Sequence, residues 1–179
     1  MPDPVNLSAL PRVPACYGWL SLDRRGGWRL QDEVVTHPGF IAFLNLHYGH
    51  DEAGNWFVQN GPQRVFVTLA CTPWVWRLGA DGDLTAHTGA AAGTADAVFV
   101  DDEGNVLLHA APGIGLLDDR DLAGFVDDCR LADGRPVDIE AFLDVMSGAG
   151  GVLWRGLPVR PIGRGELARR FGFRPEPAP

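Results

Sequence analysis

Short alternating segments bounded by glycine-containing turns constrain this chain more than any other feature. Residues 64–70 read RVFVTLA, and their side chains alternate between two faces with the two-residue period of a β-strand. Turn residues such as Gly and Asn separate segments of this kind and favour hairpins. These turn signals are Gly26-Gly27, Ala53-Gly54-Asn55, Asn60-Gly61-Pro62, Ala80-Asp81-Gly82 and residues 101–105. The pattern predicts a chain built mainly from hairpins.

Residues 36–49 follow a helical period instead and predict a helix over about 38–48. Thr36 is a suitable N-cap, Pro38 suits the first helical position, and Gly49 provides a stop. Further short helices are expected within residues 118–129, 137–146 and 165–173, and a final hairpin is expected within residues 150–162.

The two halves of the chain resemble each other, which predicts an α+β fold of two similar β-rich lobes. Each lobe is expected to be a ββ–α–ββ repeat with mostly antiparallel strands and a few short helices. The repeat can be aligned in two registers, residues 28–45 with 129–144 or residues 19–30 with 97–108. The expected division is an irregular lead-in over 1–16, a first lobe over 17–92, a second lobe with acidic helices over 93–165, and a basic, proline-rich tail over 166–179.

Charge is distributed unevenly along the 179 residues, whose net charge is −8. Residues 96–146 carry 13 acidic residues against 3 arginines, and residues 147–179 carry 2 against 6. A nucleic-acid partner is not expected, because binding to phosphates requires a basic surface. No apolar stretch is long enough to cross a bilayer, and the N-terminus lacks the pattern of a secretory leader.

The cysteines and the basic residues indicate the cellular setting. Cys16, Cys71 and Cys129 are widely spaced and odd in number, which fits reduced thiols in a cytoplasmic protein better than disulfides. All basic side chains are arginines, and together with many Ala and Gly this composition is typical of a GC-rich bacterial genome.

Two groups of polar and aromatic residues near residues 59–77 are candidates for a binding site. A polar cluster at an expected hairpin tip comprises Asn60, Gln63 and Arg64, and loops on a rigid scaffold often carry function. Trp74 and Trp76 share a strand face, with Arg77 on the opposite face. The two tryptophans either belong to the core, which their size favours, or present a stacking surface to a ligand or partner.

His47, His50 and Asp51 form the one candidate metal-binding group. Residues three apart share a helix face, so two imidazoles and a carboxylate could meet a divalent cation. The alternative is that these residues end a helix and open the next turn. No cofactor is expected, because the chain lacks a complete dinucleotide-binding motif. Serine catalysis is not expected either, because the chain lacks a nucleophile elbow.

Residues 17–78 carry a distinctive set of glycines, tryptophans and polar residues: Gly18-Trp19, Gly27-Trp28, Thr36-His37-Pro38, Asp51, Gly54, Trp56, residues 59–67 and Thr72-Pro73. With this set the chain resembles a group of uncharacterised proteobacterial proteins classed as a domain of unknown function. It is also distantly similar to a related unknown-function family whose fold repeats β-rich motifs and for which a signalling role has been suggested. The resemblance implies a repeated β-rich fold, and it identifies no catalytic residues in this chain.

Three functions remain open on this basis. The first is a non-catalytic binding or regulatory module for a small anionic ligand or a protein, using Asn60, Gln63, Arg64, Trp74, Trp76 and Arg77. The second is a metal-dependent hydrolase using the histidines and Asp51. The third is a structural interaction protein that docks through the acidic segment 96–146. An exposed strand edge or an aromatic patch could also join copies of the chain into a homo-oligomer.

Overall fold

A computed structural model describes residues 10–179 and divides them into two compact units. Unit 1 comprises residues 10–73 and 172–179, and unit 2 comprises residues 74–171. The chain therefore leaves unit 1 after Pro73 and returns to it at Gly172. The boundary between the two lobes that the sequence predicts lies between residues 92 and 93. The expected lead-in over 1–16 lies mostly outside the described residues.

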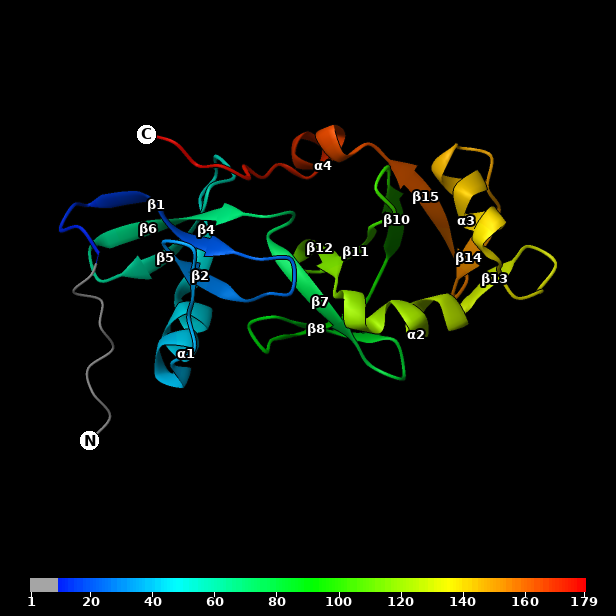
Figure 1. Cartoon of the computed structure of the whole chain (residues 1–179), viewed down its shortest axis with the longest axis horizontal. Helices are drawn as coiled ribbons and strands as arrows, with labels where there is room; N and C mark the ends of the chain where they lie inside the picture. Colours follow the sequence, from blue (N-terminus) through cyan, green and yellow to red (C-terminus); the bar gives the residue numbers. More distant parts are fainter. Residues whose placement is uncertain (1–9) are drawn as a thin grey trace. The chain divides into compact units, whose positions relative to one another are not determined.

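Unit 1 is a six-stranded sheet with one helix (Figure 1). Its sheet order is β3-β2-β1-β6-β5-β4, in which β1 and β6 are parallel and the other neighbours are antiparallel. The elements are β1 (Ala15–Leu22), β2 (Trp28–Leu30), β3 (Glu33–Val34), α1 (Pro38–His47), β4 (Tyr48–His50), β5 (Trp56–Asn60) and β6 (Gln63–Leu69).

Unit 2 is a nine-stranded sheet in the order β13-β14-β15-β10-β11-β12-β7-β8-β9, with short helices. Its strands are β7 (Trp74–Leu78), β8 (Asp83–Ala86), β9 (Ala91–Thr94), β10 (Ala97–Asp101), β11 (Val106–Ala110), β12 (Gly113–Leu117), β13 (Cys129–Leu131), β14 (Val152–Trp154) and β15 (Leu157–Ile162). Its helical segments are the 3₁₀ turn η2 (Asp119–Asp121), α2 (Leu122–Asp127), α3 (Ile139–Met146) and α4 (Arg164–Phe171).

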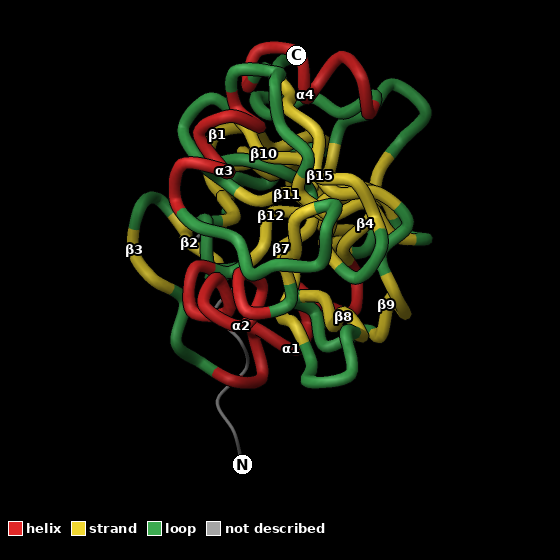
Figure 2. The backbone as a smooth tube through the Cα atoms, turned by 90° about the vertical axis from the view of Figure 1, so that its right-hand side faces the viewer, coloured by secondary structure: helices red, strands yellow, loops and turns green. Residues whose placement is uncertain are grey.

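The two units share one topology. Strands β10 to β15 occupy the positions of β1 to β6, because β10 pairs with β11 antiparallel and with β15 parallel, as β1 does with β2 and β6. The predicted α+β fold of two similar β-rich lobes is therefore confirmed, and strands dominate the regular structure (Figure 2). Only one of the two sequence alignments pairs equivalent strands. It sets residues 19–30 against 97–108, and so β1 and β2 against β10 and β11. Strands β7 to β9 extend the sheet of unit 2 beyond the repeat.

One hairpin turn recurs at six places among the described residues. In each turn the glycine at the fourth position has a positive φ and donates its N–H to the carbonyl of the first residue. The N–H of the first residue also donates to the carbonyl of the fifth residue. These two hydrogen bonds define a type I turn with a G1 bulge. The turns are 23–27, 51–55, 79–83, 86–90, 101–105 and 131–135.

Helix α1 packs one face against the sheet of unit 1. Phe40 and Leu44 are its buried residues, and with Phe43 they face apolar side chains of the strands, including Val58 and Val65. The N-cap is His37, whose Nδ1 accepts a hydrogen bond from the Phe40 N–H at 3.2 Å, so the prediction of Thr36 as the cap is wrong. Histidine replaces the hydroxyl because its ring nitrogen reaches the same orphan donor.

The C-terminal residues complete unit 1. The Leu69 N–H donates to the Pro175 carbonyl at 2.8 Å, and the Arg174 N–H donates to the Gly54 carbonyl at 2.9 Å. Gly54 has a φ of +82°, and a Cβ added there would lie 2.3 Å from the carbonyl oxygen of Gly172. Only glycine therefore allows the turn 51–55 and the returning chain to lie this close.

We expect the Gly54→Ala variant to be less stable than the Gly104→Ala variant. Gly104 occupies the same turn position in unit 2 with the same φ of +82°, but no atom lies within 4 Å of its added Cβ. Both variants carry the left-handed strain of about 1 kcal/mol, and overpacking adds about 1–3 kcal/mol for Gly54→Ala alone. Urea unfolding of both variants measures the difference, and equal losses would mean that the returning segment moves aside without cost.

Candidate functional site

The tip of the β5–β6 hairpin borders a surface hollow of about 400 Å³ in unit 1. The hollow is lined by residues 10–14 on one side and by Asn60, Pro62 and Gln63 of the hairpin on the other. The lining is therefore largely apolar, and Arg12, Asn60 and Gln63 are its residues with polar side chains. A concave site with few polar groups is the usual form of a small-molecule site.

A network of amide hydrogen bonds holds the two sides of this hollow together. The Gln63 Nε2 donates to the carbonyls of Pro11 and Val13, both at 2.7 Å, and the Arg64 N–H donates to the Pro14 carbonyl at 2.9 Å. The Oε1 of Gln63 accepts from the Asn60 Nδ2 at 3.2 Å. Gln63 is thus a positioning residue, and within residues 10–179 the Asn60 Oδ1 accepts no hydrogen bond.

Arg64 lies on the opposite face of the sheet from Gln63, because neighbouring strand residues alternate between faces. Its guanidinium carbon stands 4.6 Å from the centroid of the Phe57 ring. Phe57 packs edge-on against Phe66 at 5.8 Å, and Phe66 stacks on Tyr17 at 4.4 Å. The predicted polar cluster is therefore divided, with Asn60 and Gln63 at the hollow and Arg64 on an aromatic surface.

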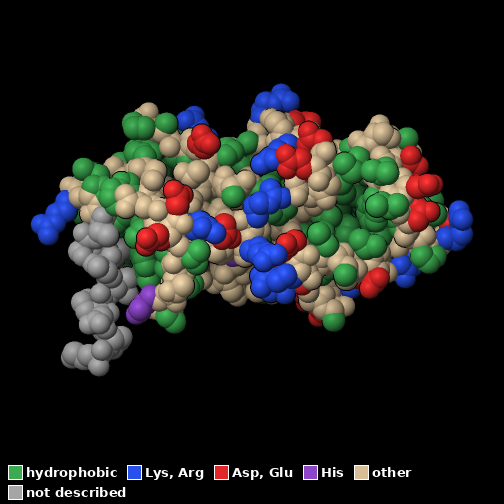
Figure 3. Space-filling model, viewed as in Figure 1, with side chains coloured by type: hydrophobic (Ala, Val, Ile, Leu, Met, Phe, Trp, Pro, Cys, Tyr) green, Lys and Arg blue, Asp and Glu red, His purple; other side chains and the backbone are tan. Residues whose placement is uncertain are grey.

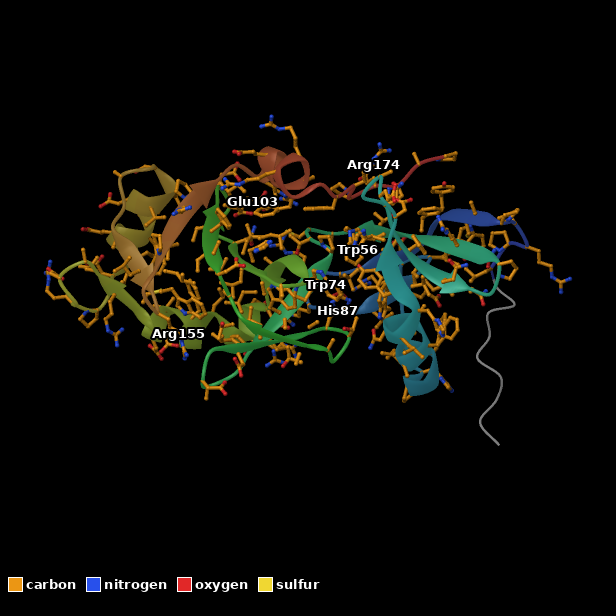
Figure 4. The ribbon with its side chains drawn as sticks, turned by 180° about the vertical axis from the view of Figure 1, so that it is seen from behind. Trp56, Trp74, His87, Glu103, Arg155 and Arg174 are labelled. Atoms are coloured by element: carbon orange, nitrogen blue, oxygen red, sulfur yellow. The ribbon has the colours of Figure 1, made fainter. Side chains whose placement is uncertain are left out.

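The two tryptophans of β7 belong to unit 2 and have different environments. Trp76 is fully buried in the core of the unit, and its indole N–H donates to the Leu108 carbonyl at 2.8 Å. Trp74 is half-buried, stacks on Trp76 at 5.7 Å, and lies 5.8 Å from the ring of His87 (Figure 4). Trp76 cannot contact a partner from this position, so its predicted role as a binding residue gives way to a role in the core.

A second hollow, of about 450 Å³, lies in unit 2 between the turn 79–83, helix α2 and the β14–β15 hairpin. Each of its neighbouring arginines is held by a carboxylate. Arg77 donates to both oxygens of Asp121, at 2.7 and 3.1 Å. Arg155 pairs with Asp128 at 2.7 Å and donates to the carbonyls of Ala80 and Asp81.

The third pair at this hollow joins Arg120 to Asp118, whose side chain is fully buried. The Asp118 carboxylate accepts from the Arg120 guanidinium at 2.5 and 2.9 Å and from its backbone N–H at 3.0 Å. Hydrogen bonds from the Arg120 side chain lower the pKa of Asp118 to about 2. Sequence reasoning missed Arg120 and Arg155, since an arginine beside an acidic residue is typical of any charged surface.

The candidate metal ligands are not brought together. The His47 ring packs on Phe43 at 4.5 Å, and the His50 ring packs on Trp56 at 4.7 Å. Asp51 caps its own turn, with Oδ1 accepting from the N–H groups of Ala53 and Asn55 and Oδ2 from the Asn55 Nδ2. Within residues 10–179, no three His, Cys, Asp or Glu side chains gather in a way that could hold a metal ion.

A protein-family model for "Protein of unknown function (DUF2946)" matches residues 4–178. The chain belongs to this family. The resemblance to an unknown-function family that the sequence indicates is thereby confirmed. No curated protein matches the chain. Among the helices of the described residues, none has both the length and the apolar character of a membrane span.

Two solved structures from a second unknown-function family, DUF1285, are similar to the chain. The protein from Silicibacter pomeroyi DSS-3 has a TM-score of 0.52 and 15% identity, over 74% of this chain and 81% of that one. The protein from Shewanella baltica OS155 has a TM-score of 0.45 and 15% identity, over 60% of this chain and 90% of that one. The first similarity, at this low identity, concerns the fold alone.

We expect the Asp118→Asn substitution to remove part of the acid sensitivity of the protein. The folded-state pKa of about 2 lies below the ordinary value of 3.8, so the ionised carboxylate stabilises the fold fully above about pH 4 and loses this effect as the pH falls toward 2. At neutral pH the variant should lose about 1–3 kcal/mol, since charge-assisted hydrogen bonds disappear. Urea unfolding at several pH values measures both effects.

Asp133 provides the matched control for this prediction. It bonds Arg135 in the same two-residue spacing, at 2.7 Å, but 53% of its side chain is exposed. Exposed ion pairs contribute about 0–1 kcal/mol, so the Asp133→Asn variant should keep near wild-type stability. Equal losses in the two variants would show that burial of Asp118 does not strengthen its ion pair.

Proposed function

We propose that this protein is a non-catalytic binding module and that unit 1 takes up a small organic anion at the tip of the β5–β6 hairpin. The observation that carries the proposal is Arg12, which lines the hollow of about 400 Å³. Within the described part of the chain, its guanidinium forms no hydrogen bond or ion pair. A cation without a partner beside apolar walls suits a carboxylate or phosphate on an apolar body.

The size and lining of the hollow support a ligand of modest size. Ligand sites commonly measure about 300–1,000 Å³ and combine apolar walls with a few placed polar groups. The amide network of Gln63 fixes the walls before any ligand arrives, which lowers the ordering cost of binding.

The corresponding hollow of unit 2 supports the choice of unit 1. Both hollows lie at the tip of the last hairpin of the repeated six strands, β5–β6 in one unit and β14–β15 in the other. In unit 2 the arginines Arg77, Arg120 and Arg155 are each paired with an aspartate. An anion would have to displace a carboxylate there, whereas in unit 1 it would meet a guanidinium that no residue in 10–179 pairs.

Asn60 narrows the class of ligand. Its Nδ2 donates to Gln63, and its Oδ1 accepts no hydrogen bond from residues 10–179, so we infer that this carbonyl oxygen accepts from the ligand. A ligand that satisfies both residues carries an anionic group for Arg12 and a hydroxyl or amino donor for Asn60. Small 2-hydroxy and 2-amino carboxylates have this combination.

We further propose a cytoplasmic location in a bacterial cell. The three cysteines form no disulfide, and Cys16 and Cys129 are buried. Burial raises the pKa of the Cys129 thiol to about 12, which keeps this thiol protonated and unreactive. Reduced structural cysteines are typical of proteins in a reducing compartment.

We expect small 2-hydroxy carboxylates such as mandelate to raise the melting temperature of the wild-type protein in a concentration-dependent way. Linkage predicts about 2.7 kcal/mol of stabilisation at a ligand concentration of about 100 times Kd. Mandelamide lacks the charge for Arg12 and phenylacetate lacks the donor for Asn60, so both should give smaller shifts. Differential scanning fluorimetry across a panel of such carboxylates measures the effect.

The Arg12→Ala variant should abolish these shifts, while Arg160→Ala should retain them. Arg160 is an exposed arginine of β15 in unit 2 and serves as the control for the loss of one positive charge. The proposal fails if no carboxylate of the panel shifts the melting temperature, or if the shifts persist in the Arg12→Ala variant.

A further inference from the structure

Helix α3 presents an exposed apolar stripe in unit 2. Ile139 and Leu143 are 76% and 57% exposed, and residues four apart lie next to each other on a helix. The other large exposed hydrophobics of the described chain, Val13, Val34, Leu46 and Val126, lie on separate elements or segments. Exposing two large aliphatic side chains side by side is unfavourable unless something covers them.

An acidic stripe runs along α3 beside the apolar one. Glu140 and Asp144 are also four residues apart, and each lies about 100° around the helix from the preceding apolar residue. Both are exposed, and neither forms an ion pair with any residue in 10–179. On the other side of the apolar stripe the half-buried Phe142 and Met146 lead into the core.

The surface around the helix has the same character. In Figure 3 hydrophobic side chains gather over the part of unit 2 that holds α2, α3 and β14, and acidic side chains border them toward the right-hand edge of the view. Acidic residues outnumber arginines by 13 to 3 over residues 96–146, so this border reflects the most acidic part of the chain.

The repeated topology does not require this helix. In unit 1 the equivalent strands β4 and β5 are joined by the turn 51–55 alone, whereas α3 is inserted between β13 and β14 in unit 2. One face of α3 does contribute to the core, through the buried Val145. The exposed stripe of the inserted helix has no such role in the fold.

We propose that α3 is a docking surface for a cationic amphipathic segment of another protein. The apolar face of such a segment would cover Ile139 and Leu143, and its Lys or Arg side chains would reach Glu140 and Asp144. Helix-on-groove and helix-on-helix recognition of this kind uses apolar anchors at helical spacing, and complementary charges set the orientation.

Charge argues against the other occupants of this surface. A second copy would oppose its own acidic stripe to Glu140 and Asp144, and like charges across an interface are unfavourable. The basic segment 147–179 of a second copy offers no exposed large hydrophobic residue to cover the apolar stripe. Anionic lipids and nucleic acids would be repelled by the same carboxylates.

The test uses three synthetic helical peptides and the full-length protein. The first has leucines at positions i, i+3, i+4 and i+7 with lysines elsewhere, the second replaces lysine with glutamate, and the third replaces leucine with serine. Fluorescence anisotropy should detect binding of the lysine–leucine peptide alone, with an affinity that falls as salt rises.

The wild type and three variants separate the apolar and the electrostatic contributions to peptide binding. The Ile139→Ser/Leu143→Ser variant should bind about tenfold more weakly or worse, because anchor residues dominate such interfaces. The Glu140→Gln/Asp144→Asn variant should bind more weakly and lose most of the salt dependence. The Leu46→Ser variant removes a leucine of α1 that is 78% exposed in unit 1, about as exposed as Ile139 at 76%, and should bind like the wild type.

Three results would overturn the proposal. One is equal binding of the lysine–serine peptide, which would reduce the surface to a general acidic patch. Another is wild-type affinity of the Ile139→Ser/Leu143→Ser variant for the lysine–leucine peptide, or no binding of that peptide by the wild type. The third is a wild-type dimer in sedimentation that this double variant dissociates, because the stripe would then be covered by a second copy.

Discussion

The parallel pairing of the first and last strands of the repeat is the constraint on which the rest of each unit depends. β1 lies beside β6 from Ala15–Arg64 to Leu22–Leu69, and β10 lies beside β15 from Val98–Val159 to Asp101–Ile162. Parallel neighbours cannot be joined by a tight turn, so the chain must cross over between them. Within this crossover the other strands lie on either side of the central parallel pair, and a helix lies on one face of the sheet. In unit 1 that helix is α1, whose buried Phe40 and Leu44 cover the central strands.

Many polar residues that the sequence offers as candidate site residues form hydrogen bonds to backbone groups in the structure instead. Asp51 and Asp101 hold their turns in the same way, with Oδ1 on two backbone N–H groups and Oδ2 on an Asn side chain. Gln63 holds the lead-in to β1 through two carbonyls. Backbone groups beside a turn or strand end need partners, and a short polar side chain nearby supplies them. Within residues 10–179 the Arg12 guanidinium forms no such bond, which is why the proposed function rests on it.

Local structure could be predicted from the sequence, because it depends on neighbouring residues. Glycines at turn positions and the apolar period of residues 38–48 located hairpins and α1 to within a residue. Strand order could not be predicted, since paired residues of β1 and β6 are 47 to 49 positions apart in the sequence and four other strands lie between them. The return of residues 172–179 to unit 1 is of the same long-range kind. The six predicted binding residues were consequently assigned to one site, although Asn60, Gln63 and Arg64 belong to unit 1 and Trp74, Trp76 and Arg77 to unit 2.

The two units differ where the shared topology leaves the chain free to vary. At the last hairpin tip, unit 2 uses Arg155 to hold the added turn 79–83, while unit 1 keeps its hollow open beside Arg12. Between the fourth and fifth strands, unit 1 keeps a five-residue turn, while unit 2 inserts α3. A duplicated scaffold that retains its strand pairing can change at such connections without loss of the core, because loops tolerate insertion. The hollow of unit 1 and the exposed stripe of unit 2 thus lie at different connections of one repeat, and we propose different binding partners for them.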